Sequence, residues 1–210
     1  MGTADQCRQR HAGSGLPPER RGLITSFAAV CGLLLFVVPM YGQAVLYNNG
    51  PDAEVGYYRI NFGATTIDSF ELSEEATLSN VTLTIYDVDD RNIPKYLLWT
   101  ITTKPSGGTV LGSGFVGLSR LQDPYLTKFL FFAWKVGFEI PKLTIPGGTY
   151  YIQLQDVVTQ WNSQAFWAVS SGPSLAYHGE VGPSESAAAQ LAPVASESFA
   201  ILGEWTGMQH

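Results

Sequence analysis

Cysteine and histidine are both scarce in this 210-residue chain. The two cysteines, Cys7 and Cys31, precede residue 45, so a domain that starts there has no thiol. That absence excludes a disulfide framework, a thiolate metal site and a cysteine nucleophile. Of the three histidines, only His178 and His210 lie beyond residue 45, and no Gly-x-Ser-x-Gly motif occurs. We expect His178 in an exposed loop, and neither zinc nor a Ser-His-Asp triad has a convincing set of residues.

Basic residues are also few. The chain has 12 Lys and Arg against 18 Asp and Glu. Four arginines and two acidic residues lie in the first 44 residues, which leaves 8 basic and 16 acidic residues and a net charge of −8 beyond them. No basic cluster is present there to contact phosphates, so the sequence argues against binding to nucleic acid or to anionic lipid.

One long uncharged apolar run is present, and it lies near the N-terminus. Leu23–Val38 follows Arg20-Arg21 and precedes the small residues of Gly42-Gln43-Ala44. This order predicts a signal peptide over residues 1–44, with a long lead-in and cleavage after Ala44. A retained membrane anchor is the alternative, although 16 apolar residues are fewer than the roughly 20 that a spanning helix needs. The expected location is secreted or cell-surface, with the periplasm as a variant, and any membrane contact would come through an uncleaved signal segment.

The rest of the chain alternates between apolar and polar residues. Val81, Leu83 and Ile85 alternate with Thr82, Thr84 and Tyr86, and similar runs occur around Trp99, Trp134 and Ile152. A period of two is typical of strands with one buried face. The pattern predicts an all-β fold, an antiparallel β-sandwich of jelly-roll type, with Trp99, Trp134 and Trp167 in its core.

About ten strands are expected in a single domain over residues 45–210, and no segment has a convincing amphipathic helix. The longest expected loop is 170–196, which is rich in Gly, Pro, Ser and Ala. The expected strands lie near 45–48, 57–61, 66–72, 77–87, 95–103, 109–117, 127–140, 149–155, 164–169 and 197–202.

An ordered set of short motifs resembles one class of proteins. The motifs are Leu46–Pro51, Asp68–Phe70, Trp99–Ile101, Gly147–Leu154 and Ser196–Ile201. In this order they resemble bacterial exported β-sandwich proteins of the kind that often carry a PEP-CTERM sorting tail. The resemblance implies the fold and an exported or surface location, and it carries over no activity or binding residue. Glu204–His210 lacks the Val-Pro-Glu-Pro motif, apolar helix and basic cluster of that tail, so we expect free secretion.

An acidic segment provides a candidate calcium site. Asp87, Asp89, Asp90 and Asn92 are hard oxygen donors within six residues, and Ca²⁺ takes 6–8 such ligands. The Gly at position 6 and the Glu at position 12 of a helix–loop–helix calcium loop are missing, and a solvated loop between two strands is the alternative interpretation. Apart from this calcium, no cofactor is expected.

Aromatic residues provide a candidate carbohydrate site. Trp161 lies between Gln160 and Asn162, so its indole would offer an apolar face to a sugar ring with polar groups beside it. Phe166 and Tyr177 are expected as supporting rings. The sequence therefore favours a non-catalytic exported structural or interaction protein that binds extracellular polysaccharide or other surface proteins. A secreted polysaccharide hydrolase is the alternative, which would need two carboxylates across a cleft.

Overall fold

The computed structural model describes residues 43–180 and 191–207, all of which belong to one compact unit. These residues contain no helix, and hence none that is long and apolar enough to cross a membrane. The predicted signal peptide lies outside them, apart from Gln43 and Ala44. The described residues form fourteen strands: β1 (Ala44–Asn48), β2 (Asp52–Arg59), β3 (Ala64–Leu72), β4 (Ala76–Asp87), β5 (Pro94–Thr102), β6 (Val110–Gly117), β7 (Ser119–Arg120), β8 (Tyr125–Leu126), β9 (Phe132–Ile145), β10 (Gly148–Thr159), β11 (Phe166–Ser170), β12 (Ala176–Glu180), β13 (Ala192–Val194) and β14 (Phe199–Trp205).

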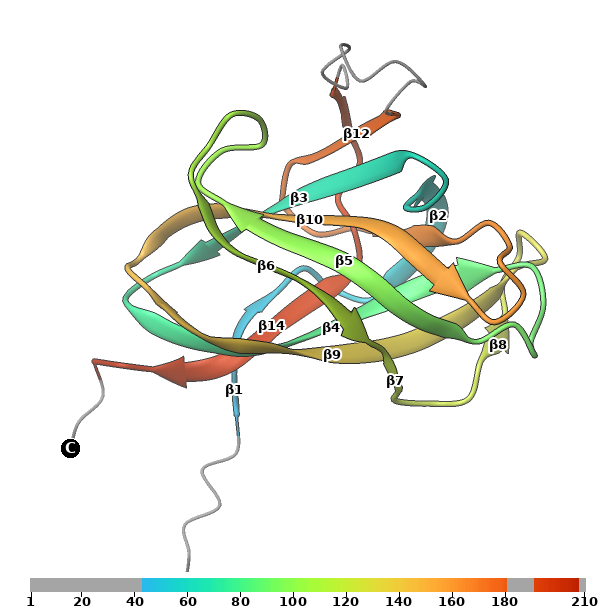
Figure 1. Ribbon diagram of the computed structural model, residues 1–210, viewed down its shortest axis with the longest axis horizontal. Coiled ribbons are helices and arrows are strands. Elements are labelled where there is room, and N and C mark those ends of the chain that lie inside the picture. Colours follow the sequence, from blue (N-terminus) through green and yellow to red (C-terminus); the bar gives the residue numbers. More distant parts are fainter. Residues whose placement is uncertain (1–42, 181–190, 208–210) are drawn as a thin grey trace, which may run out of the picture. The chain divides into compact units, whose positions relative to one another are not determined.

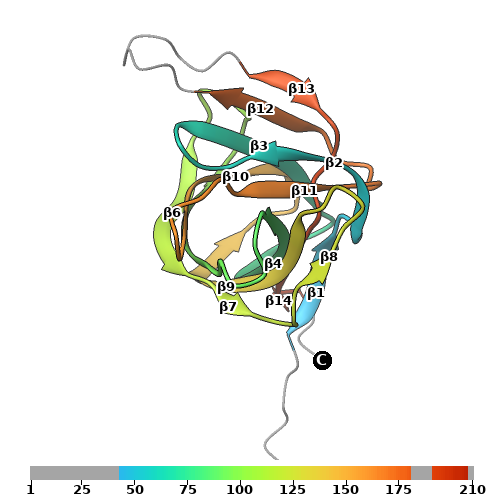
Figure 2. The ribbon, with the colours of Figure 1, turned by 90° about the vertical axis from the view of Figure 1, so that its right-hand side faces the viewer.

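Two antiparallel sheets pack against each other, which confirms the predicted all-β sandwich. The six-stranded sheet has the order β13-β12-β3-β10-β5-β6. In the eight-stranded sheet, β4 pairs with β9 along one edge and with β14 and then β11 along the other. Strand β1 extends this sheet beside β14, and β2 extends it beside β11. In both ribbon views the six-stranded sheet lies above the sheet that contains β4, β9 and β14 (Figures 1 and 2).

The core lies between the sheets and follows the predicted alternation. Val81, Leu83 and Ile85 of β4 are buried, and so are the alternate residues of β5, β9 and β10 on the inward face. Trp99, Trp134 and Trp167 are at most 2% exposed, so the expectation that these three indoles form the core is confirmed. Each buries on the order of 150–250 Å², which makes them a large part of the apolar area that stabilises the fold.

The segment 170–196, predicted as a loop, contains two strands. Its residues have low β-propensity, yet β12 pairs with β3 along Ala176–Glu180 and β13 pairs with β12. The free edge of β3 offers backbone donors and acceptors, and pairing with them outweighs local propensity. His178, predicted to be exposed in a loop, lies in β12 and is half-buried, with its Nδ1 3.0 Å from the Thr66 hydroxyl.

The strand predicted over 127–140 is observed as β9 over Phe132–Ile145, so both of its ends lie later in the sequence than predicted. Thr127 and Phe131 close a turn through their backbone groups, and Leu130 within it has φ of 63°. Strand β9 therefore starts at Phe132, and it continues past Pro141 to Ile145. The apolar residues of this turn resemble the sequence of a strand, but the backbone of the turn does not pair with β4.

Candidate functional site

The outer face of the six-stranded sheet brings together polar side chains from five strands. Residues paired across neighbouring antiparallel strands point to the same face. One row of paired residues runs from β12 to β6 through Tyr177, Ile67, Gln153, Thr100 and Ser113. Four strand spacings separate its ends, which corresponds to about 19 Å. We call this row, with the parallel row through Thr65, Gln155, Leu98 and Phe115, the polar strip.

The side chains of the polar strip provide donors and acceptors for hydrogen bonds. Gln153 Nε2 donates to Gln155 Oε1 at 2.7 Å, and Gln155 Nε2 donates to Asp156 Oδ2 at 3.5 Å. Each amide nitrogen has a second hydrogen that can be donated to a ligand. Thr100 and Ser113 add hydroxyl groups beside them. Uncharged amides and hydroxyls in a row can bind a ligand that itself presents many hydroxyl groups.

An aromatic pair lies at each end of the polar strip. Tyr96 and Phe115 stack with ring centroids 5.6 Å apart and an angle of 16° between their planes. Both side chains are exposed, Tyr96 by 46% and Phe115 by 59%. Tyr151 and Tyr177, at the β12 side, have ring centroids 6.4 Å apart. These exposed rings offer apolar surface against which a ligand can pack.

A groove of about 310 Å³ lies over the polar strip. Its floor includes Thr65, Thr100, Gln153 and Gln155, and one wall is the loop Lys104–Gly108 between β5 and β6. Among the described residues that line this groove there is no carboxylate. The arrangement can bind and orient a polar ligand, but it lacks the paired acids that hydrolysis of a glycosidic bond requires.

Trp161 lies two residues beyond the end of β10 and is half-exposed, as predicted for the least core-like tryptophan. Its backbone N–H donates to Asn92 Oδ1 at 2.7 Å, which fixes the turn against the β4–β5 loop. The Arg91 guanidinium lies 5.4 Å from the centre of its ring. One face of the indole is therefore already in contact with a cation.

The structure distributes the predicted rings Trp161, Phe166 and Tyr177 over different elements. Phe166 belongs to β11 in the eight-stranded sheet and is half-buried, with its ring 4.9 Å from that of Tyr57. Tyr177 belongs to β12 in the six-stranded sheet. Of the three, Tyr177 lies in the polar strip, whereas Phe166 packs within an aromatic cluster.

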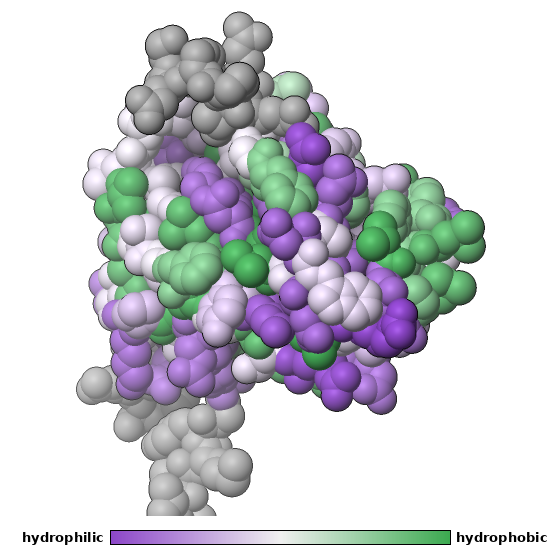
Figure 3. Space-filling model, turned by 45° about the vertical axis from the view of Figure 1, so that its right-hand side comes forward, coloured by the Kyte–Doolittle hydropathy of each residue, from purple (hydrophilic) through white to green (hydrophobic). Residues whose placement is uncertain are grey.

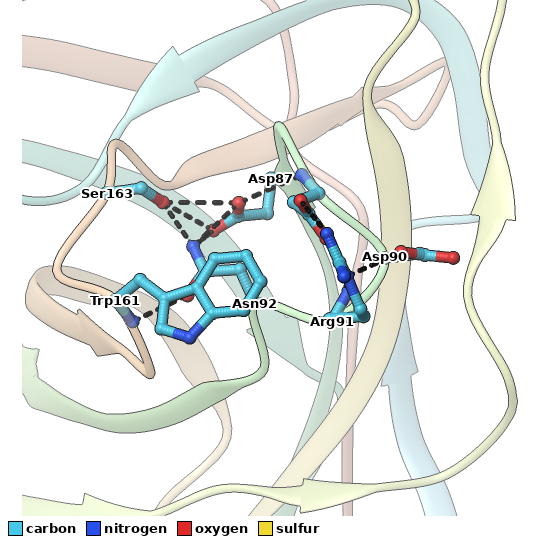
Figure 4. A network of polar contacts seen from close by, with 7 residues as sticks. Asp87, Asp90, Arg91, Asn92, Trp161 and Ser163 are labelled. Atoms are coloured by element: carbon cyan, nitrogen blue, oxygen red, sulfur yellow. Dashed lines mark hydrogen bonds and ion pairs between the residues drawn. The ribbon is translucent and has the colours of Figure 1, made fainter.

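The predicted calcium residues form a hydrogen-bonded loop closure (Figure 4). Asn92 Nδ2 lies 2.9 Å from both carboxylate oxygens of Asp87, and the Ser163 hydroxyl donates to the same carboxylate. Asp87 and Asn92 are fully buried. Burial raises the pKa of Asp87, although the hydrogen bonds from Asn92 and Ser163 oppose that change.

Asp89 and Asp90 point away from this buried group. Asp89 pairs with the exposed guanidinium of Arg91 at 3.3 Å, and Asp90 lies 3.8 Å from the same group. The four candidate ligands are thus divided between a buried pair and a solvent-facing pair. In the described part of the chain, no three His, Cys, Asp or Glu side chains form a group suited to a metal ion. Calcium binding by this loop stays a prediction.

Sequence reasoning missed most of the polar strip. The alternation in β5 did indicate that Leu98, Thr100 and Thr102 share one face. It could not indicate that Gln153 of β10 lies opposite Thr100, because register between strands distant in the sequence is fixed by the fold as a whole. No motif marks the stacked pair of Tyr96 and Phe115 for the same reason.

The space-filling view in Figure 3 shows polar and apolar side chains interspersed over the middle of the face in view. Apolar side chains gather at its right-hand edge. Comparison with known proteins adds no assignment, because no protein-family model and no curated protein matches this chain.

Proposed function

We propose that this is a non-catalytic exported or cell-surface protein that binds extracellular polysaccharide through the polar strip. In this proposal the sandwich is of jelly-roll type, and the chain is related to the bacterial exported proteins that its motifs resemble. The observation that carries the proposal is the row of amides and hydroxyls between two aromatic pairs on one exposed face.

The chemistry of a sugar chain matches this face. A pyranose ring has apolar C–H groups that pack on aromatic side chains and hydroxyl groups that need hydrogen-bond partners. Tyr177 and Phe115 supply rings near opposite ends, and Gln153 with Thr100 supplies polar groups between them. Sites for small ligands combine apolar walls with a few placed polar groups in the same way. A length of about 19 Å suits an oligomer better than a single sugar.

The lining of the groove supports binding without turnover. Lys104 is the charged residue among the described groove-lining side chains, and a hydrolase would place two carboxylates about 5–10 Å apart across such a groove. Surface proteins are the other class of partner, and a groove with amides and hydroxyls on its floor favours polysaccharide over them.

A glycan array probed with the full chain tests the proposal. We expect binding to at least one polysaccharide, and weaker binding for Tyr177→Ala and Gln153→Ala. Loss of a ring that contributes about 1–2 kcal/mol weakens affinity roughly 5- to 30-fold at 25 °C, which calorimetry can resolve.

Two further variants complete this experiment. Leu126→Ala removes an exposed apolar side chain from β8 of the other sheet and is expected to leave affinity unchanged. Trp161→Ala tests the separate prediction for that indole. Failure of every polysaccharide to bind the wild type would refute the proposal, as would unchanged affinity in folded Tyr177→Ala and Gln153→Ala.

A further inference from the structure

Glu197, which lies between β13 and β14, is a buried acid. Its exposed fraction is 0%, and neither Oε1 nor Oε2 has a hydrogen-bond partner among the described residues. It lies two residues before Phe199 and four before Ile201, which face the core. By the alternation of an extended chain, Glu197 also points between the sheets.

A second buried acid, Asp68 of β3, faces the same interior. Asp68 is also 0% exposed, and its Oδ2 accepts a hydrogen bond from the backbone N–H of Glu197 at 2.6 Å. Burial, together with the nearby charge of Asp68, raises the pKa of Glu197 well above its usual range, and burial raises that of Asp68 to about 6. The two acids therefore interact directly.

Oxygen atoms from three parts of the chain converge beside this pair. The side-chain nitrogen of Asn49 lies 2.6–3.1 Å from four oxygens: Asp68 Oδ2, Ser174 Oγ, Ser196 Oγ and the carbonyl oxygen of Glu197. A carboxamide has two hydrogens, so it can donate to two of these oxygens and leaves the others without a donor from Asn49. The Ser174 and Ser196 hydroxyls bond to each other at 2.6 Å, and Asp68 Oδ1 accepts from the backbone N–H of Ser69 at 2.6 Å. The Glu197 carboxylate is therefore the acceptor of this cluster that has no donor among the described residues.

In residues 43–180 and 191–207, no ion pair joins Asp68 or Glu197 to a lysine, arginine or histidine. An uncompensated charge in a dry interior is strongly disfavoured, and a buried acid either takes up a proton or binds a cation. The oxygen atoms gathered around Asn49, together with a buried carboxylate that has no donor in the described part of the chain, favour a cation.

We propose that Asp68 and Glu197 bind one calcium ion between the sheets. The carbonyl oxygen of Glu197 and the hydroxyl groups of Ser174 and Ser196 would complete the oxygen set, and the Asn49 amide would turn to present its oxygen. Calcium fits this set because it takes 6–8 oxygen ligands in irregular geometry. Magnesium demands a near-ideal octahedron, and zinc prefers nitrogen or sulfur.

The ion would join parts of the chain that lie far apart in the sequence. Asn49 follows β1, Asp68 lies in β3, Ser174 precedes β12, and Glu197 precedes β14. An ion held by all four segments ties the first and last strands of one sheet to the other sheet. Bound calcium therefore stabilises the folded state over the unfolded state, which has no such site.

Thermal unfolding of the full chain after EDTA treatment, with and without added CaCl₂, tests the proposal. We expect Tm to rise saturably, by roughly 5–10 °C at a calcium concentration 100-fold above Kd, and calorimetry to give one ion per chain. Glu197→Gln keeps the shape of the side chain but removes its charge, so its Tm should not respond to calcium.

Asp52→Asn is the control, since it neutralises a half-buried acid that already accepts hydrogen bonds from the Tyr86 and Tyr125 hydroxyls. It should respond to calcium as the wild type does. If Glu197→Gln fails to fold, Ser196→Ala serves instead, with an expected loss of affinity of about tenfold for one ligand. The proposal is refuted if the wild type binds no calcium, which leaves a protonated Glu197. It is also refuted if Asp52→Asn abolishes the response while Glu197→Gln or Ser196→Ala retains it.

Discussion

At the scale of the residue, the buried acids Asp87 and Glu197 differ in how their charge is compensated. The Asp87 carboxylate accepts hydrogen bonds from Asn92 and Ser163, whereas Glu197 has no hydrogen-bond partner among the described residues. Donors close to an acid make burial tolerable, and their absence makes a ligand or a proton necessary. The acidic segment around Asp87 led to the calcium prediction from the sequence, although the Asp87 carboxylate has more hydrogen-bond donors than the carboxylate of Glu197.

Asp87 gives stability a defined dependence on pH. Its pKa in the folded state is raised by burial above the unfolded value of about 3.9. The folded chain therefore binds more protons than the unfolded chain in the interval above pH ~4, and the contribution of Asp87 to stability falls as pH rises through that interval. We expect the free energy of unfolding of the wild type to fall, relative to that of Asp87→Asn, as pH increases from about 4.

Urea denaturation of both proteins in EDTA, at several pH values, measures this difference. Asp90→Asn is the control, because Asp90 is exposed beside Arg91 and its replacement should leave the pH profile unchanged. A difference between wild type and Asp87→Asn that stays constant or grows with pH would contradict the assignment.

At the scale of the element, β6 depends on glycine where it crosses Trp99. The ring of Trp99 lies against the backbone of β6, and a Cβ added at Gly112 would lie 3.1 Å from the ring atom Cη2. A larger side chain there must displace the indole from the core. We expect Gly112→Val to lower the free energy of unfolding by about 1–3 kcal/mol, as overpacking does.

Gly117 in the same strand provides the control. A Cβ at Gly117 would meet no atom closer than 3.9 Å, so Gly117→Val should change stability by no more than about 0.5 kcal/mol. Denaturant midpoints at equal m-values give the comparison. Equal effects of the two substitutions would show that Trp99 does not restrict β6.

The strands also show which structural features a sequence pattern can predict. Alternation in β4, β5, β9 and β10 identified the inward residues correctly, because one face of each strand is buried in the core. It failed for β12, whose pairing with β3 depends on a free edge far away in the sequence. Alternation also cannot predict the polar strip or the Asp68–Glu197 cluster, because only the fold brings their residues together.

At the scale of the whole molecule, β1 sets a limit on where a signal peptide can end. Ala44 and Val45 pair with Gly203 and Leu202 of β14. Asn49, directly after β1, donates to the buried acidic cluster. Cleavage after Ala44 keeps Val45–Asn48 beside β14, whereas cleavage several residues later would remove the strand and expose the edge of β14.

We therefore expect exported protein to begin at Val45, with its β1 pairing almost complete. N-terminal sequencing or intact mass of protein recovered from culture medium or periplasm gives the first residue. A start at Gln43 fits the same processing region and keeps all of β1. Recovery only from the membrane fraction, with Leu23–Val38 still attached, would contradict cleavage and favour an anchor. A start beyond Asn48 would contradict the role of β1, because a chain without that strand loses the edge pairing that covers β14.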